Sequence, residues 1–233
     1  MKTLKSVIIA AIILCGISMN AQAQDNDYYK TKNEVAITIG GPSNSQFIDV
    51  FSELFGIMGS ALVTSMATGG QYTGYVTYEN EKNIPAISVE YFHHLNKTIS
   101  IGGVIGFNGT FRDMYCTFQK NSDSGNTVIE SKEKIGSAKK YYFTVMPSVK
   151  FDWLRKKNFG LYSKVALGLT YMHEQEKQDN KDGEKELNND SDIMGNFQAS
   201  FLGIEAGSER LRGFVELGVG EQGILVAGCR YKF

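Results

Sequence analysis

The chain has 233 residues, and its 24 lysines and arginines against 25 aspartates and glutamates leave a formal net charge of −1. This balance lacks the overall basic excess of proteins that bind nucleic acid, so we expect no nucleic-acid partner. Hydrophobic residues make up 42 % of the chain. After residue 23, however, no continuous apolar run reaches the roughly 20 residues that a membrane-spanning helix needs. The composition therefore argues against a helical membrane protein.

Residues 1–23 have the form of a secretory signal peptide. Lys2 and Lys5 precede a short apolar run, and Ala21-Gln22-Ala23 provides the small residues expected before a cleavage site at Gln24. The apolar run is too short to cross a bilayer as a helix. We therefore expect an exported mature chain of residues 24–233, with 22 basic and 25 acidic residues.

The mature chain alternates between apolar and polar residues with a period of two, which predicts β-strands. The pattern is clearest over 141–153 and 159–171. Near Phe201 the apolar positions change phase, which predicts a β-bulge. Eight strand-length segments carry the alternation: 35–39, 87–91, 99–111, 141–153, 159–171, 194–207, 211–219 and 225–233.

A helix is expected between the first two strands. Over 46–67 apolar residues recur at helical spacing, and Gly69-Gly70 would end the helix. The apolar stripe has to contact something, which could be the barrel rim, the membrane surface or a protein partner. We expect a cap packed on the rim, and a protein partner is the main alternative. The candidate contact residues are Phe47, Phe51, Leu54, Phe55 and Met58.

The connections between the expected strands alternate in length. The segments 94–97, 154–157 and 207–210 are tight turns, whereas 42–84, 112–138 and 174–193 are long. Outer-membrane barrels have short periplasmic turns and long external loops. With an even number of strands, this pattern predicts a barrel in the cell outer membrane with both termini in the periplasm.

The polar faces of the strands indicate which side meets lipid. These faces carry mostly small uncharged residues, and Lys164 is the only charge in the segment 159–171. A soluble barrel needs a charged exterior, whereas small residues suit the narrow interior of an eight-stranded barrel. We therefore expect the apolar faces to meet lipid and the polar faces to line the lumen.

A few charged residues fall on the expected lumen faces. Buried ions are costly unless they pair, so we expect a structural network of salt bridges, with Glu216 and Arg230 on adjacent strands. The alternative is a polar pore whose selectivity these charges set. The residues are Glu90, Lys150, Asp152, Lys164, Arg212, Glu216 and Arg230, together with Lys232.

The C-terminus carries a family resemblance. Gly228, Tyr231 and Phe233 match the last-strand assembly signal of bacterial outer-membrane barrels, although Val226 stands where that pattern prefers a polar residue. The chain resembles small OmpA- and OmpX-type proteins, and particularly the outer-membrane β-barrel domain family of Bacteroidetes. The resemblance implies an all-β, eight-stranded antiparallel up-and-down transmembrane barrel, recognised by the barrel-assembly machinery and surrounded by outer-membrane lipid and lipopolysaccharide.

Catalytic chemistry finds little support in the sequence. His93 and His94 fall at an expected periplasmic turn. His173 lies at the outer end of a strand, and Ser163 is about ten residues away from it, or roughly 30 Å along the strand. We expect no metal or cofactor, and Cys116 and Cys229 should lie too far apart for a disulfide.

The function expected from the sequence is therefore that of a non-enzymatic integral outer-membrane protein. Its loops would serve membrane integrity, adhesion or contact with a partner at the cell surface. A small pore is one alternative, and a lipid A-modifying enzyme is a less favoured one.

Overall fold

The computed structural model describes residues 31–121, 127–179 and 185–233, so the expected signal peptide lies outside the described residues. The strands form one closed antiparallel barrel in which each strand pairs with its neighbours in sequence and β1 pairs with β8. This topology confirms the predicted eight-stranded up-and-down barrel. In chain order the elements are β1 (Asn33–Gly41), α2 (Asn44–Ala67), β2 (Tyr72–His94), β3 (Ile99–Asn121), β4 (Thr127–Arg155), β5 (Phe159–Asp179), β6 (Lys185–Gly207), β7 (Leu211–Gly220) and β8 (Leu225–Lys232).

Side chains alternate between the interior and the exterior of the barrel, as the sequence period predicts. On β7 every second residue is buried and the residues between them are exposed. The predicted bulge near Phe201 is also confirmed, because the register between β6 and β7 shifts between Ser200 and Leu202. The bulge explains why the apolar positions of β6 change phase there.

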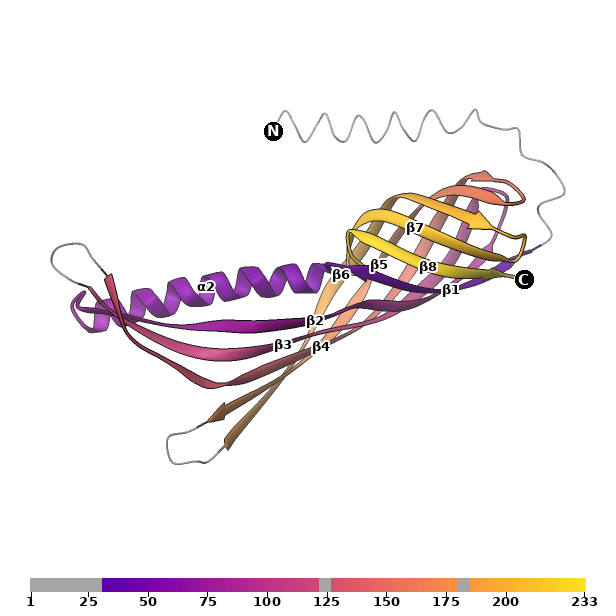
Figure 1. The fold of residues 1–233 in the computed structure, drawn as a ribbon. Helices are drawn as coiled ribbons and strands as arrows, with labels where there is room; N and C mark the ends of the chain where they lie inside the picture. The colour runs from indigo at the N-terminus through magenta and orange to yellow at the C-terminus, as the bar shows by residue number, and fades with distance from the viewer. Residues whose placement is uncertain (1–30, 122–126, 180–184) are drawn as a thin grey trace, which may run out of the picture.

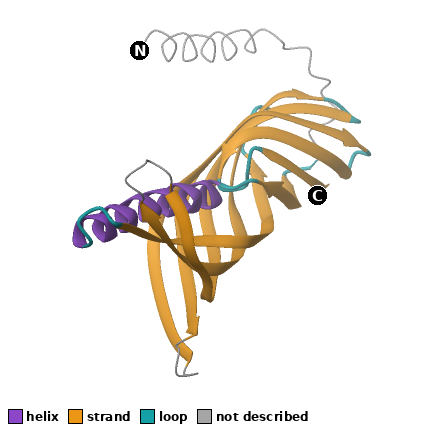
Figure 2. Cartoon of the chain, turned by 60° about the vertical axis from the view of Figure 1, so that its left-hand side comes forward, coloured by secondary structure: helices purple, strands orange, loops and turns teal. Residues whose placement is uncertain are grey.

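The strands differ greatly in length. β1, β7 and β8 have 8 to 10 residues, whereas β2 to β6 have 21 to 29. The long strands continue beyond the closed barrel as paired hairpins, which spread apart in Figures 1 and 2. Much of the expected loops 112–138 and 174–193 is therefore strand, which corrects the prediction. Cross-strand pairing explains this, because it satisfies the backbone hydrogen bonds of a long excursion.

The two ends of the barrel are distinct. We call the end at which Asn33 hydrogen-bonds to Phe233 the terminal end, and the opposite end, where α2 begins, the helix end (Figure 1). The turns that follow β2, β4 and β6 are short, as predicted, and close the terminal end. The extended part of β2, β3 and β4 at the helix end is called the ribbon.

Helix α2 begins where a helix is predicted. Ser43 caps it, since its side chain accepts from the Gln46 backbone while the Gln46 side chain accepts from the Ser43 backbone. By length and composition α2 could cross a bilayer, with a mean hydropathy of 1.5. This corrects the sequence expectation that no mature segment meets such a criterion, because the few polar residues of α2 break its apolar run without lowering its average much.

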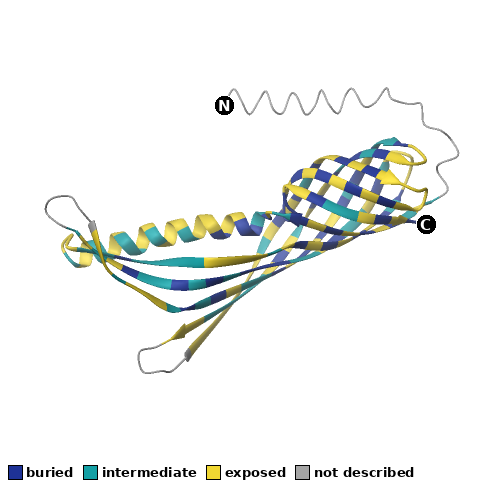
Figure 3. Ribbon diagram, in the orientation of Figure 1, coloured by how far each residue is buried: buried dark blue, intermediate teal, exposed yellow. Residues whose placement is uncertain are grey.

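The orientation of α2 is the opposite of the expected one. Its buried residues are Ser45, Gln46 and Asp49, whereas its apolar stripe is exposed along the whole helix (Figure 3). The prediction that the stripe packs on the barrel rim is therefore wrong. The physical reason is that polar groups line both the barrel mouth and the inner side of the ribbon. They form hydrogen bonds and ion pairs with the polar face of the helix, so this face turns inward.

Candidate functional site

The barrel interior at the terminal end is organised around one carboxylate. Glu205 accepts hydrogen bonds from Arg212 at 2.5 Å and from Arg230 at 2.7 Å. Lys232 donates a third. All four side chains are buried. Because a carboxylate has about four lone-pair sites, one glutamate can serve three cations from β7 and β8.

A second carboxylate, Glu34 on β1, extends this cluster. It accepts a hydrogen bond from Lys150 and lies 3.1 Å from Nε2 of His94. Lys150 also lies 3.5 Å from Asp152, and Nδ1 of His94 lies 2.5 Å from the Ser100 hydroxyl. His94 is thus buried within the network, which corrects its assignment to a surface turn.

Arg230 connects the terminal cluster to the middle of the barrel. Its guanidinium lies 3.5 Å from Glu90 and 3.9 Å from Glu216. It also lies over two aromatic rings, 4.7 Å from the centre of Tyr162 and 4.3 Å from that of Phe214. The rings pack against the flat faces of the cation, and the carboxylates approach its edge.

The middle of the barrel holds a second cation between two carboxylates. Nζ of Lys164 lies 2.5 Å from Glu90 and 2.8 Å from Glu216. Glu216 also accepts from Ser200 at 2.6 Å and from Tyr162 at 2.7 Å. The charges here are therefore paired, and neutral hydroxyls occupy further acceptor sites.

Buried charge is balanced among the described residues. Seven buried carboxylates stand against seven buried basic side chains, counting Asp49 and Arg112 at the helix end, so their formal sum is zero before His94 is counted. A balanced set limits the cost of removing ions from water. The acids are Asp49, Asp152, Glu34, Glu90, Glu205, Glu216 and Glu221, and the bases are Arg112, Arg155, Arg212, Arg230, Lys150, Lys164 and Lys232.

The turn between β7 and β8 closes the helix end of the interior. Glu221 accepts from the Ser45 backbone N–H at 3.0 Å and from the Ser45 hydroxyl at 2.7 Å. The amides of Asn108 and Asn196 donate to it at 2.7 and 2.8 Å. Because a helix N-terminus favours an anion, Glu221 fastens the first turn of α2 inside the barrel mouth.

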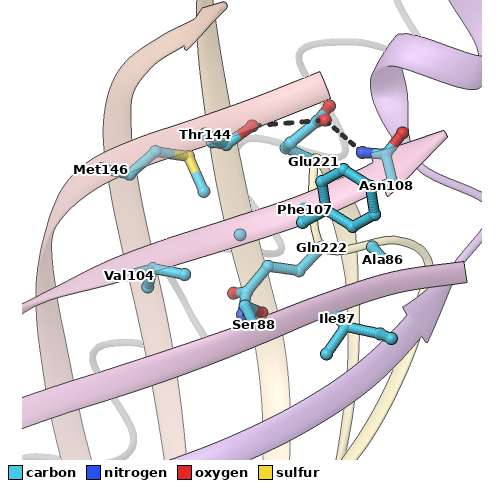
Figure 4. A pocket seen from close by; sticks show the side chains of 11 residues that line it. Ala86, Ile87, Ser88, Val104, Phe107, Asn108, Thr144, Met146, Glu221 and Gln222 are labelled. Atoms are coloured by element: carbon cyan, nitrogen blue, oxygen red, sulfur yellow. Dashed lines mark hydrogen bonds between the residues drawn. The ribbon is translucent and has the colours of Figure 1, made fainter. Parts of the chain in front are cut away.

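Glu221 and Gln222 together are called the plug, and Gln222 extends further into the barrel than Glu221. Its amide donates to the Ser88 hydroxyl and to Glu90, each at 2.8 Å, which links the plug to the ion pairs. The pocket beside it, drawn in Figure 4, holds about 10 Å³. That volume suits roughly one water molecule, so the interior at this level is filled with side chains.

Charged contacts fix α2 to the ribbon and to the mouth. Asp49 accepts from the Tyr142 hydroxyl at 2.6 Å and from Lys140 at 3.0 Å. One turn further along, Glu53 lies 3.4 Å from Arg112 and accepts from the Tyr78 backbone N–H at 3.2 Å. Asp49 and Glu53 are the only charged residues of α2, and both point inward.

Tyr78 lies on the ribbon, beyond the closed barrel. Burial raises the pKa of Tyr78 to about 12, and the carboxylates of Glu176 and Glu174 contribute to the rise. The guanidinium of Arg112 lies 4.5 Å from the centre of its ring and acts in the opposite direction. Tyr78 is therefore partly shielded from water where the ribbon meets α2.

The residues that the sequence places in the lumen are all buried inside the barrel. Three further carboxylates that hold much of the network together were not predicted from the sequence, namely Glu34, Glu205 and Glu221. Alternation within β1 and β6 could have identified Glu34 and Glu205. Glu34 directly precedes Val35 and Glu205 directly follows Ile204, and because neighbouring residues of a strand point to opposite sides, both glutamates face the interior. No strand pattern could have identified Glu221, because it belongs to a turn that folds inward.

The apolar residues proposed for partner contact lie on the outward side of α2. Phe51 and Phe55 are 62 % and 69 % exposed, and this side of the helix carries no charge. We call it the apolar face of α2. Its large side chains are Phe47, Ile48, Val50, Phe51, Leu54, Phe55, Met58, Leu62, Val63 and Met66.

The C-terminal residues proposed as an assembly signal lie on and beside the closing strand. Tyr231 and Phe233 both point outward, and their stacked ring centres are 6.1 Å apart. Gly228 points inward, where an added Cβ would come within 2.5 Å of the Ile37 carbonyl oxygen and within 2.7 Å of the Phe214 ring. Glycine is therefore required for β8 to approach β1 and Phe214.

His173 has a serine neighbour on the adjacent strand, which was not predicted from the sequence. Its Nδ1 lies 2.9 Å from the hydroxyl of Ser191 on β6, because the register pairs the two residues directly across β5 and β6. The expectation for His173, which considered only Ser163 at roughly 30 Å along its own strand, is therefore corrected. Distance along one strand was the wrong measure, since the partner lies on the adjacent strand.

Other candidate chemistry is sparse. The two cysteines of the described residues, Cys116 and Cys229, are both free, as predicted. Within residues 31–121, 127–179 and 185–233, no cluster of three or more His, Cys, Asp or Glu side chains is placed to hold a metal ion.

Comparisons with known proteins add a similarity of fold. No protein-family model matches the chain, and no curated protein matches it. It is similar to the crystal structure of Ail, the attachment invasion locus protein of Yersinia pestis, with 12 % identity, a TM-score of 0.36, and coverage of 87 % of this chain and 99 % of Ail. Ail in complex with the heparin analogue sucrose octasulfate gives 14 % identity, a TM-score of 0.34 and the same coverage. At these values the similarity does not establish a family.

Proposed function

We propose that this chain is an integral outer-membrane protein that presents the ribbon and α2 outside the cell, in a non-enzymatic display role. One observation carries the proposal, namely that the barrel is polar inside and apolar outside. Among the described residues fourteen charged side chains are buried in the barrel and at its helix end, while exposed large apolar residues cover the outer wall. Such a surface is stable in hydrocarbon, whereas in water it would be an exposed apolar patch far larger than soluble monomers carry.

The dimensions of the barrel support the same proposal. β1, β7 and β8 are 9, 10 and 8 residues long, close to the roughly 9–11 residues with which a tilted strand crosses a bilayer. The longer strands exceed this by about twelve residues, or on the order of 40 Å at 3.3 Å per residue. The extra length lies at the helix end, so we place that end outside the cell and both termini in the periplasm.

A filled interior favours a display role over a pore. Paired charges occupy the middle of the barrel, and Glu221 and Gln222 close the helix end. We expect planar bilayers containing the folded protein to show no steady single-channel conductance. A stable conductance that changes in Lys164→Gln would instead support the pore.

The apolar face of α2 is the surface that we propose for a protein partner. The opposite side of the helix is already engaged through Asp49 and Glu53, so the apolar face stays available. A photo-crosslinking amino acid at Phe55 should yield an adduct with a second protein on cells, and the same group at Lys134, on the charged side of the ribbon, should not. Adducts formed only within the chain would exclude the partner.

Membrane orientation can be tested by cysteine labelling on intact cells. In a Cys116→Ala, Cys229→Ala background, Glu133→Cys on the ribbon should react with a membrane-impermeant maleimide. The matched variant Lys156→Cys, in a turn at the terminal end, should react only after the outer membrane is permeabilised. The reverse pattern, or release of folded protein without detergent, would contradict the proposal.

Further proposed partners follow from the membrane location. We propose that outer-membrane lipid and lipopolysaccharide surround the barrel wall, and that the barrel-assembly machinery recognises Gly228, Tyr231 and Phe233. Phe233→Ala should then lower the amount of folded, heat-modifiable protein in the outer membrane. Unchanged assembly in Phe233→Ala would remove this role.

A further inference from the structure

Three side chains of β5 and one of β6 form a polar group on the outer wall. Tyr171, His173 and Gln175 alternate along one face of β5, and Ser191 lies opposite His173. Tyr171 is exposed, with Ile193 of β6 paired to it. These two apolar residues are among the last on this part of the wall before the sequence becomes polar, so the group lies at its outer border.

The four side chains form a connected chain of hydrogen bonds. The Tyr171 hydroxyl donates to Oγ of Ser191 at 3.0 Å. Oγ lies 2.9 Å from Nδ1 of His173, and the Gln175 amide nitrogen lies 3.3 Å from Nε2 of the same ring. The oxygen and nitrogen of a side-chain amide exchange places by a half-turn, and in the orientation with the oxygen toward Nε2, Gln175 accepts from Nε2–H. Nδ1 is then the unprotonated nitrogen and accepts the serine proton.

This geometry has the three parts of an activated nucleophile. A hydroxyl lies within hydrogen-bond distance of a base, and a third group orients the base. In the resting site the Tyr171 hydroxyl donates to Oγ of Ser191, and rotation of this O–H toward a bound ester would let it stabilise the developing oxyanion. Ser191 is exposed, so a bulky ester can approach it.

We propose that Ser191, His173, Gln175 and Tyr171 form a hydrolytic site for ester-linked lipids of the outer leaflet. The location of the substrate rests on the proposed membrane insertion, because only then does the border of the apolar wall meet the ester groups of lipids. The site adds an activity to the display role and uses none of the interior residues.

The reaction balances with water as the only co-reactant. Oγ of Ser191 adds to the ester carbonyl while Nδ1 of His173 takes the hydroxyl proton, and the carbonyl oxygen becomes negative beside the Tyr171 hydroxyl. The C–O bond to the alcohol breaks, and His173 returns the proton to the departing alcohol. Water then adds to the acyl-serine as His173 removes its proton, which releases the fatty acid and restores the serine.

A fluorophosphonate probe tests the nucleophile without knowledge of the lipid. Protein folded in micelles should gain the mass of one probe at Ser191, with labelling at least tenfold slower in His173→Ala and absent in Ser191→Ala. Ser163 is the matched control, since it also lies on β5 but bonds to the Trp153 indole at 3.1 Å instead of to a histidine. Ser163→Ala should label like the parent chain.

Hydrolysis is then measured on vesicles of phosphatidylethanolamine that contain the folded protein, with released fatty acid as the readout. Loss of release in Ser191→Ala, with retained heat-modifiable mobility, supports the site. Absence of both probe labelling and fatty-acid release in well-folded protein would overturn it, and so would equal labelling at Ser163. Neither result bears on membrane insertion, which the cysteine labelling on cells tests separately.

Discussion

Arg230→Met should be among the most destabilising substitutions in this barrel. The Arg230 side chain is fully buried. Its removal leaves seven buried carboxylates against six buried basic groups and takes a cation away from Glu205, Glu216 and Glu90. Removing one partner of a buried ion pair typically costs about 3–5 kcal/mol, because the remaining charge is uncompensated.

A loss of about 4 kcal/mol corresponds to roughly a thousandfold change in the unfolding equilibrium. Reversible urea unfolding in lipid vesicles, followed by Trp153 fluorescence, measures it. The control is Lys132→Met, whose ion pair with Glu79 lies on the exposed ribbon. Exposed pairs contribute about 0–1 kcal/mol.

A rescue variant tests whether charge imbalance is the cause. Oε2 of Glu90 has Arg230 at 3.5 Å but accepts no hydrogen bond. Adding Glu90→Gln to Arg230→Met should therefore recover about 0.5–3 kcal/mol, the range of coupling between residues in contact. Charge imbalance is refuted as the cause if Arg230→Met lowers the free energy of unfolding no more than Lys132→Met does. It is also refuted if the double variant loses the sum of the stabilities that the two single variants lose.

Gly102→Ala should block assembly of heat-modifiable barrel, because its Cβ would lie 1.8 Å from a carbonyl oxygen on β2; Gly103→Ala, with 3.5 Å of clearance, should assemble normally, and equal yields would contradict this. Glu221→Ala strips the acceptor from several buried donors, at about 1–3 kcal/mol. It should speed proteolysis within α2, and an unchanged cleavage rate would show that the plug does not hold the helix. Because the Tyr78 pKa is raised to about 12 in the folded chain, its contribution to stability is present below the usual tyrosine pKa of about 10 and is lost as pH rises toward 12. The difference between the absorbance titrations of the parent chain and Tyr78→Phe isolates this residue from the other tyrosines, and a midpoint of that difference curve near 10 would refute the raised pKa.

Strand number and the two faces of the wall could be read from the sequence, because a period of two leaves each residue only two possible sides. Residues 141–153 and 159–171 show this most plainly. The phase change near Phe201 was also readable, since a bulge is a local event that shifts every later residue.

The candidate sites could not be predicted from the sequence to the same extent. Ser191 meets His173 only because the register of β5 against β6 places them opposite each other, and register is a relation between segments. Glu221 enters the barrel because its turn folds inward to meet the N-terminus of α2. Neither relation leaves a periodic pattern along one segment.

Local periodicity alone determined that this chain forms a barrel with an apolar outer surface and a polar interior. Tertiary structure decided which charges pair, that the long connections continue as strands, and that α2 turns its apolar face outward. The physical reason is that burial of the stripe on α2 competes with hydrogen bonds and ion pairs offered by distant strands, such as that between Asp49 and Tyr142. The outcome depends on groups that come together only when the barrel closes.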